Sequence, residues 1–73
     1  MAITLKAARV NSGLDQKAAA MRLGVTPETL GNWERGNTFP TVPQITALEK
    51  LYGVHYSDIN FFPQNVGLSD KTG

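Results

Sequence analysis

The segment GVTPETLGNWERG, residues 24–36, carries the residues of this sequence best suited to recognition by hydrogen bonds. If residues 27–35 form a helix that turns about 100° per residue, Leu30 and Trp33 fall on one side and face a core. The opposite side then holds only small or polar residues: Pro27 at its edge, Glu28, Gly31, Asn32 and Arg35. A helix that enters the major groove of DNA needs short hydrogen-bonding side chains with no bulk between them. The segment therefore predicts a surface that reads base edges.

Each of these residues has a chemistry suited to DNA, and each also has a simpler explanation. Asn32 can pair with N6 and N7 of adenine, Glu28 can accept from N4 of cytosine, and Arg35 can reach a guanine or a phosphate. Gly31 would let the helix or a thymine methyl group come close. Alternatively, Glu28 only complements the helix dipole, Asn32 and Arg35 are solvated surface residues, and Gly31 has no special role.

Other kinds of chemistry find little support. The sequence has no cysteine and one histidine, His55, which we interpret as a turn residue rather than a metal ligand. No pair of carboxylates has the setting of a general acid and a general base. We therefore expect no enzyme, no metal site and no bound cofactor.

Length and composition describe a small domain of almost neutral charge. Seventy-three residues suffice for one domain with a small core. The net charge of +1 and the isoelectric point of about 8.1 leave the partner open, because strong nucleic-acid binders exceed about 9. No apolar run approaches the roughly 20 residues of a membrane span, and no signal peptide is visible. We expect a soluble, cytoplasmic protein with no membrane partner.

Helix start and stop signals predict the scaffold that positions the polar face. Five residues can cap the start of a helix: Thr4, Asp15, Thr26, Thr41 and Ser57. Glycines or a proline follow each predicted helix, so the helices should span residues 5–12, 16–23, 27–35, 42–52 and 58–62. In the fourth, a stripe of apolar residues should face the core: Val42, Ile45, Leu48 and Leu51. We expect an all-α bundle of five short helices over residues 1–63, with a loose tail over residues 64–73.

The connection between the second and third predicted helices is the most informative one. It has three residues, Gly24-Val25-Thr26. A short turn that contains glycine between two short helices is typical of a helix-turn-helix. Val25 is apolar and should close the corner of this turn.

The segment LDQKAAAMRLGVTPETLGNWERG resembles the helix-turn-helix of the lambdoid phage repressor and Cro family of transcription regulators. The resemblance covers residues 3–62, and the runs LKAARVNSGLDQKAAA and FFPQNVGL are similar to short regulators of phages of low-GC bacteria in particular. The matching marks are Gln16, Ala20, Leu23-Gly24-Val25, Trp33-Glu34-Arg35-Gly36, Pro40, residues 48–54 and residues 57–59. Asp15, Ala19 and Gly31 depart from the family pattern. Asp15 places a negative charge near the DNA backbone, and Gly31 removes a possible base contact.

The resemblance implies a phage repressor DNA-binding domain-like fold and roles for further residues. Gln16 would hold a phosphate at the start of the second helix, where free backbone N–H groups also point at the anion. Other candidates for the DNA backbone are Lys17, Thr26, Thr29, Asn37 and Thr38. An arginine late in the first helix often pairs with the glutamate of the third, which predicts a partly buried Arg9–Glu34 bridge. The alternative is two independent surface charges.

The charge distribution bears on oligomeric state and function. Few phosphates would be neutralised by one subunit, so we expect a homodimer on an operator with half-sites about one helical turn apart. Phe61 and Phe62 are the candidate interface, unless one belongs to the core and the other only covers it. The predicted function is repression by dimeric occupancy of double-stranded DNA. The alternative is a protein-binding module, antitoxin-like or antirepressor-binding, and an antirepressor is also a candidate partner. We expect a complete small protein rather than half of a longer repressor.

Overall fold

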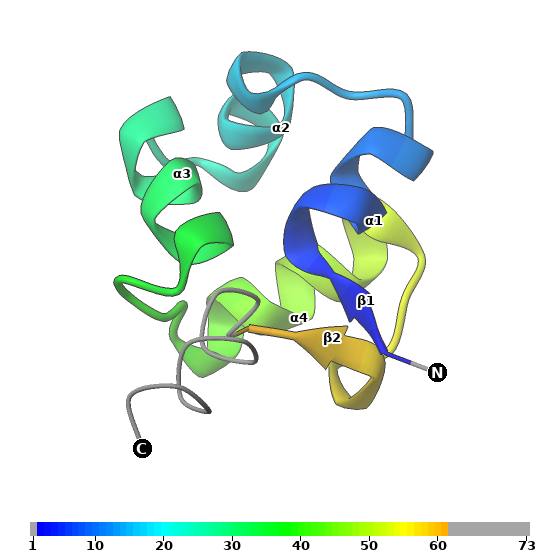
Figure 1. The fold of residues 1–73 in the computed structure, drawn as a ribbon. Coiled ribbons are helices and arrows are strands. Elements are labelled where there is room, and N and C mark those ends of the chain that lie inside the picture. The colour runs from blue at the N-terminus through cyan, green and yellow to red at the C-terminus, as the bar shows by residue number, and fades with distance from the viewer. Residues whose placement is uncertain (1, 62–73) are drawn as a thin grey trace, which may run out of the picture.

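The computed structural model describes residues 2–61, and all four helices predicted before residue 53 are present (Figure 1). The elements are, in chain order, β1 (Ile3–Thr4), α1 (Leu5–Asn11), α2 (Gln16–Leu23), α3 (Pro27–Arg35), α4 (Val42–Tyr52), the 3-10 turn η1 (Tyr56–Asp58) and β2 (Ile59–Asn60). No helix in this part of the chain combines the length and the apolar character needed to cross a membrane.

The four α-helices begin at the predicted caps. The side-chain oxygens of Thr4, Asp15 and Thr26 accept backbone N–H bonds at 3.0, 2.7 and 3.1 Å, each from the residue three positions further on. Thr41 forms a reciprocal capping box with Gln44, in which each side chain satisfies the other's backbone N–H. Such a cap contributes about 1 kcal/mol to stability. Local side-chain chemistry therefore accounts for where the helices start.

The three-residue turn between α2 and α3 depends on Gly24. Gly24 has a φ of 75° in the left-handed region, and its N–H donates to the last turn of α2. A residue with a Cβ adopts this conformation only at a cost, which explains the glycine at this position. The half-buried Val25 packs against the core at this corner, as predicted.

The core lies where all four helices meet. Its largest fully buried side chains are Leu5 of α1, Leu30 of α3 and Leu48 of α4. Ala19 and Ala20 of α2 are completely buried, and their small size allows the backbone of α2 to approach α3 and α4 closely. Trp33 is buried beside Leu30, as the helical periodicity of α3 predicts. One side of α3 is therefore committed to the core.

The predicted fifth helix over residues 58–62 is wrong. Tyr56–Asp58 form a single 3-10 turn, and Ile59–Asn60 form a strand that pairs in parallel with Ile3–Thr4. Figure 1 shows the two strands side by side, away from α2. Ile59 is buried there opposite Ile3, and the extended backbone satisfies its hydrogen bonds across the pair rather than along a helix. A local reading of DINFF could not include a partner from the other end of the domain, and Phe62 lies outside the described residues.

Candidate nucleic-acid interface

The outward face of α3 is built on the two residues that anchor the helix. With Leu30 and Trp33 buried, the opposite side of the helix points to solvent. Pro27, Glu28 and Arg35 are exposed there, and Asn32 is half-buried. Thr26 caps the helix, and Pro27 occupies its first turn, where the missing N–H costs no hydrogen bond. The structure therefore brings four of the five predicted base-reading residues to one accessible surface.

Gly31 is less accessible than the sequence predicted. It is buried, because two side chains lie over it: a Cβ at this position would be 3.2 Å from Nη1 of Arg35 and 3.4 Å from Nε2 of Gln16. The helical periodicity of α3 gives the direction of Gly31 correctly, but it contains no information about α2. Gln16 reaches across from the neighbouring helix, and Arg35 reaches back from the next turn of α3.

Arg35 and Asn32 are joined in this structure. Nη2 of Arg35 donates a hydrogen bond of 2.9 Å to Oδ1 of Asn32. The two residues are one turn apart on α3 and both belong to its outward face. They form a single polar unit rather than two separate side chains.

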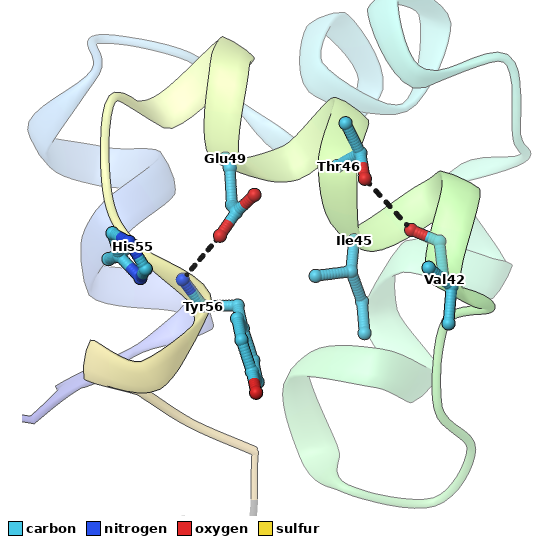
Figure 2. Close-up of a pocket in the computed structure, with 6 residues that line it drawn as sticks. All are labelled: Val42, Ile45, Thr46, Glu49, His55 and Tyr56. Carbon is cyan, nitrogen blue, oxygen red and sulfur yellow. Dashed lines mark hydrogen bonds between the residues drawn. The ribbon is translucent and has the colours of Figure 1, made fainter.

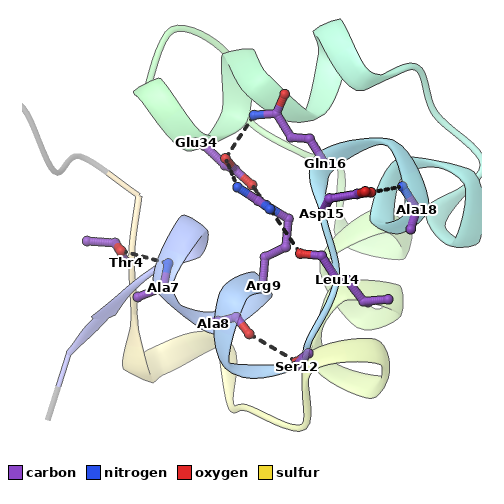
Figure 3. Close-up of polar contacts among 10 residues, drawn as sticks. All are labelled: Thr4, Ala7, Ala8, Arg9, Ser12, Leu14, Asp15, Gln16, Ala18 and Glu34. Atoms are coloured by element: carbon purple, nitrogen blue, oxygen red, sulfur yellow. Dashed lines mark hydrogen bonds and ion pairs between the residues drawn. The ribbon is translucent and has the colours of Figure 1, made fainter.

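Gln16, which was predicted to contact the DNA backbone, is held in place by a hydrogen bond within the protein. It is the first residue of α2, and its Nε2 donates to Oε1 of Glu34 at 3.0 Å. Figure 3 shows its amide oxygen pointing away from Glu34. The amide nitrogen keeps a second N–H for another acceptor. Gln16 therefore lies between the start of α2 and the end of α3.

The other predicted backbone contacts lie around the same two helices. Lys17 is exposed in the first turn of α2, and Asn37 and Thr38 are exposed directly after α3. Thr26 Oγ1 accepts from the Thr29 backbone N–H at 3.1 Å and donates to Thr29 Oγ1 at 2.9 Å. The two threonines are thus tied to each other at the start of α3.

The predicted pair of Arg9 and Glu34 is formed. Both residues are buried, and Nε of Arg9 donates to Oε2 of Glu34 at 2.7 Å (Figure 3). Nη1 of Arg9 also donates to the carbonyl oxygen of Leu14, in the loop before α2, at 3.0 Å. The hydrogen bond to Glu34 raises the pKa of the Arg9 guanidinium above its ordinary value, although burial opposes the rise. One arginine therefore links α1, the loop to α2 and the end of α3.

Of the two predicted dimer residues, the structure describes only Phe61. Phe61 is half-buried and packs against the core, and Phe62 lies outside the described residues. Exposed apolar surface occurs elsewhere: Val42 is 76% exposed and Tyr56 is 54% exposed. The expected inward direction of Val42 is therefore wrong, because the first residue of α4 extends past the edge of the core.

Val42 and Tyr56 line a groove that the sequence did not predict (Figure 2). This α4–η1 groove has a volume of about 500 Å³ and is lined by Val42, Ile45, Thr46, Glu49, His55 and Tyr56. Oε2 of Glu49 accepts from the backbone N–H of Tyr56 at 2.8 Å and holds η1 against α4. The groove arises from a contact between α4 and η1, so the sequence alone carried no signal for it.

Metal-binding chemistry is not evident at this surface. Between residues 2 and 61, no group of three or more His, Asp or Glu side chains has the arrangement of a metal site. His55 lies near Ser57, with 3.2 Å between its Nδ1 and the hydroxyl oxygen.

A family model described as helix-turn-helix, of the type found in phage repressors and Cro, matches residues 5–59. No curated protein and no solved structure gives a significant match to the chain. The matched range contains α2, the turn at Gly24 and α3, together with α1 and α4 that hold them.

Proposed function

The chain belongs to the helix-turn-helix family of DNA-binding transcription regulators, and we propose that it binds one double-stranded operator sequence and represses by occupying it as a dimer. Its reading helix is α3, and its backbone contacts come from α2 and from the residues after α3. The regulator acts in the cytoplasm of a bacterial host and belongs to the phage repressor and Cro-like class.

The observation that carries this proposal is the division of α3 into two faces. Leu30 and Trp33 are buried, while Glu28, Asn32 and Arg35 lie on the accessible side. A helix of this kind can enter the major groove with its polar side chains toward the base edges, and the rest of the domain remains outside. Family membership alone would leave the binding surface undefined.

The buried network behind α3 supports the same proposal. Arg9 and Gln16 both donate hydrogen bonds to the carboxylate of Glu34. The end of α3 and the start of α2 are therefore fixed relative to each other. The start of a helix offers unpaired N–H groups to a phosphate. The network thereby sets the distance between a phosphate contact at Gln16 and the base contacts of α3.

The exposed cations and polar groups around these helices fit a modest number of phosphate contacts. Lys17, Asn37 and Thr38 are exposed, and Thr26 and Thr29 stand at the start of α3. A net charge of +1 allows little non-specific attraction to DNA. Useful affinity then requires two subunits on a repeated site.

The α4–η1 groove is the surface that we assign to the second copy in such a dimer. Its exposed Val42 and Tyr56 supply the apolar contact that the half-buried Phe61 supplies only in part. α4 follows α3 after a short loop, so a contact at this groove sets the spacing between the two reading helices. In a symmetric pair the same patch of each subunit meets its copy, so the groove of one subunit would face the groove of the other.

Selection from a randomised duplex pool, followed by fluorescence anisotropy and a salt titration on the selected site, tests this function. We expect a two-fold repeated site, steep salt dependence, and weaker binding by Arg35→Ala. Asn11→Ala, at an exposed position at the end of α1, is the control for a general effect of surface substitution. Enrichment of no sequence, even at low salt, would contradict the proposal.

A protein-binding role is the second candidate. Asp15 and Glu28 place negative charges beside the proposed DNA surface, and the net charge is close to zero. An antitoxin-like module, or a module that binds an antirepressor, would tolerate these negative charges and a net charge close to zero. If selection fails while the protein remains folded, the outward face of α3 becomes a protein-docking surface.

A further inference from the structure

A glycine in the middle of a helix is unusual, and the surroundings of Gly31 in α3 explain it. The Arg35 side chain folds back over Gly31, and a Cβ there would lie 3.2 and 3.6 Å from its two terminal nitrogens. The first distance is tighter than most real Cβ contacts, so with an alanine the guanidinium would have to shift by a few tenths of an ångström. Glycine at position 31 therefore allows Arg35 to lie where it does.

The position of Arg35 determines what Asn32 can do. Reading adenine requires the asparagine oxygen to accept from N6 while the amide nitrogen donates to N7. In this structure the oxygen already accepts from Nη2 of Arg35 at 2.9 Å. This bond uses one of the two lone pairs of the oxygen, so adenine N6 would have to share the oxygen with the guanidinium or displace it.

Arg35 keeps most of its hydrogen-bonding capacity in this arrangement. A guanidinium has five N–H donors in a planar fork, and the bond to Asn32 uses one of them. The same bond limits rotation of the long side chain, so less conformational entropy is lost when it meets a base. Two parallel donors of a held guanidinium match O6 and N7 of guanine.

We propose, on the basis of the function given above, that Arg35 and Asn32 form one reading unit that recognises guanine and that Gly31 is the residue that permits it. Arg35 contacts the base. Asn32 is a positioning residue that holds the guanidinium, and it does not read adenine. Gln16, whose Nε2 lies 3.4 Å from the same Cβ position, closes the other side of Gly31 and places its proposed phosphate contact beside the guanine contact.

The proposal is tested with the site that the wild-type protein selects, by measuring binding to duplexes that differ at one base pair. The same duplexes are measured with Arg35→Lys, and the base pair to examine is the one at which this variant loses the preference that the wild type shows. There, we expect the wild type to prefer guanine over adenine by roughly 5- to 140-fold, which is the discrimination of one good bidentate contact. Gly31→Ala should reduce this ratio severalfold, because it displaces the guanidinium.

Asn32→Asp distinguishes a role of Asn32 in holding Arg35 from a role in reading adenine. Aspartate still offers an oxygen to Arg35, but it cannot donate to N7 of adenine. The added negative charge should weaken binding to all sites similarly, while the guanine preference should remain. Arg22→Lys, at an exposed arginine in the last turn of α2, should leave the ratio unchanged and is the matched control for Arg35→Lys.

Specific outcomes would overturn this inference without affecting the proposed function. The first is a selected site with adenine at the Arg35-dependent position and loss of that preference in Asn32→Asp. The second is an unchanged guanine preference in Gly31→Ala. If no sequence is enriched from the pool, both the inference and the proposed function fail.

Discussion

Arg9 and Glu34 lie 25 positions apart in the sequence, and their side chains meet in a buried ion pair of 2.7 Å. The pair connects the first helix with the last turn of the proposed reading helix. Glu34 accepts hydrogen bonds from Gln16 as well as from Arg9, and Arg9 donates to Leu14. Side chains of α1 and α2 therefore both donate to one carboxylate of α3, and this ties the orientation of α3 to the rest of the fold.

Removing one partner of this pair should be strongly destabilising. Glu34→Gln leaves the buried guanidinium of Arg9 without its counter-ion, and we expect a loss of about 3–5 kcal/mol in the free energy of unfolding. Arg9→Met should cost a similar amount, and the double variant should cost less than the sum of the two. Urea denaturation monitored by Trp33 fluorescence completes the double-mutant cycle. Additive effects would show that the pair has no coupling energy.

Gly31→Ala should change stability and base preference in opposite directions. Alanine favours the helix interior over glycine by about 0.5–1 kcal/mol, and the group it meets is the mobile end of Arg35. We therefore expect a higher unfolding midpoint together with weaker discrimination for guanine. Thermal denaturation measures the first effect. A lower midpoint would mean that the guanidinium cannot move aside.

Stability should fall at alkaline pH through Tyr52. Its hydroxyl is buried and has no hydrogen-bond partner among residues 2–61, and burial raises its pKa from 10.0 to about 12. The unfolded chain ionises first, so stability is complete below pH 10 and declines as the pH rises toward 12. The loss should be on the order of 2–3 kcal/mol. Urea midpoints between pH 8 and pH 11.5 would be measured for the wild type and for Tyr52→Phe.

Tyr52→Phe should remove this part of the pH dependence at little cost near neutral pH. Within the part of the chain that the structure describes, removal of this hydroxyl leaves no hydrogen-bond partner unsatisfied. An equally steep alkaline decline in Tyr52→Phe would assign the effect to other groups.

The proposed dimer should depend on the α4–η1 groove. Val42→Asp places a charge on a residue that is 76% exposed, so the monomer should remain folded. We expect the dimer dissociation constant from sedimentation equilibrium to increase by about tenfold or more. Val10→Asp is a matched control, since Val10 of α1 is 57% exposed and lies outside the groove. Equal effects of the two substitutions would argue against this interface.

Local chemistry made α1 to α4 predictable. Thr26, Pro27 and Gly36 act on backbone groups within a few residues of themselves, so the start and end of α3 could be read directly from the sequence. The same holds for the burial of Leu30 and Trp33, because helical periodicity places residues on faces without knowledge of the rest of the fold. The likeness to a known family supplied the Arg9–Glu34 pair, which periodicity alone would not identify.

The sequence by itself therefore determined the four α-helices, the short turn at Gly24 and which face of α3 is polar. Tertiary structure decided the rest, because those features require a partner distant in the chain. Ile59 is extended because it pairs with Ile3. Gly31 is covered because Gln16 arrives from α2, and Val42 and Tyr56 form a groove because η1 packs against α4. A residue's own neighbours determine its local conformation, while what covers it depends on how the helices pack.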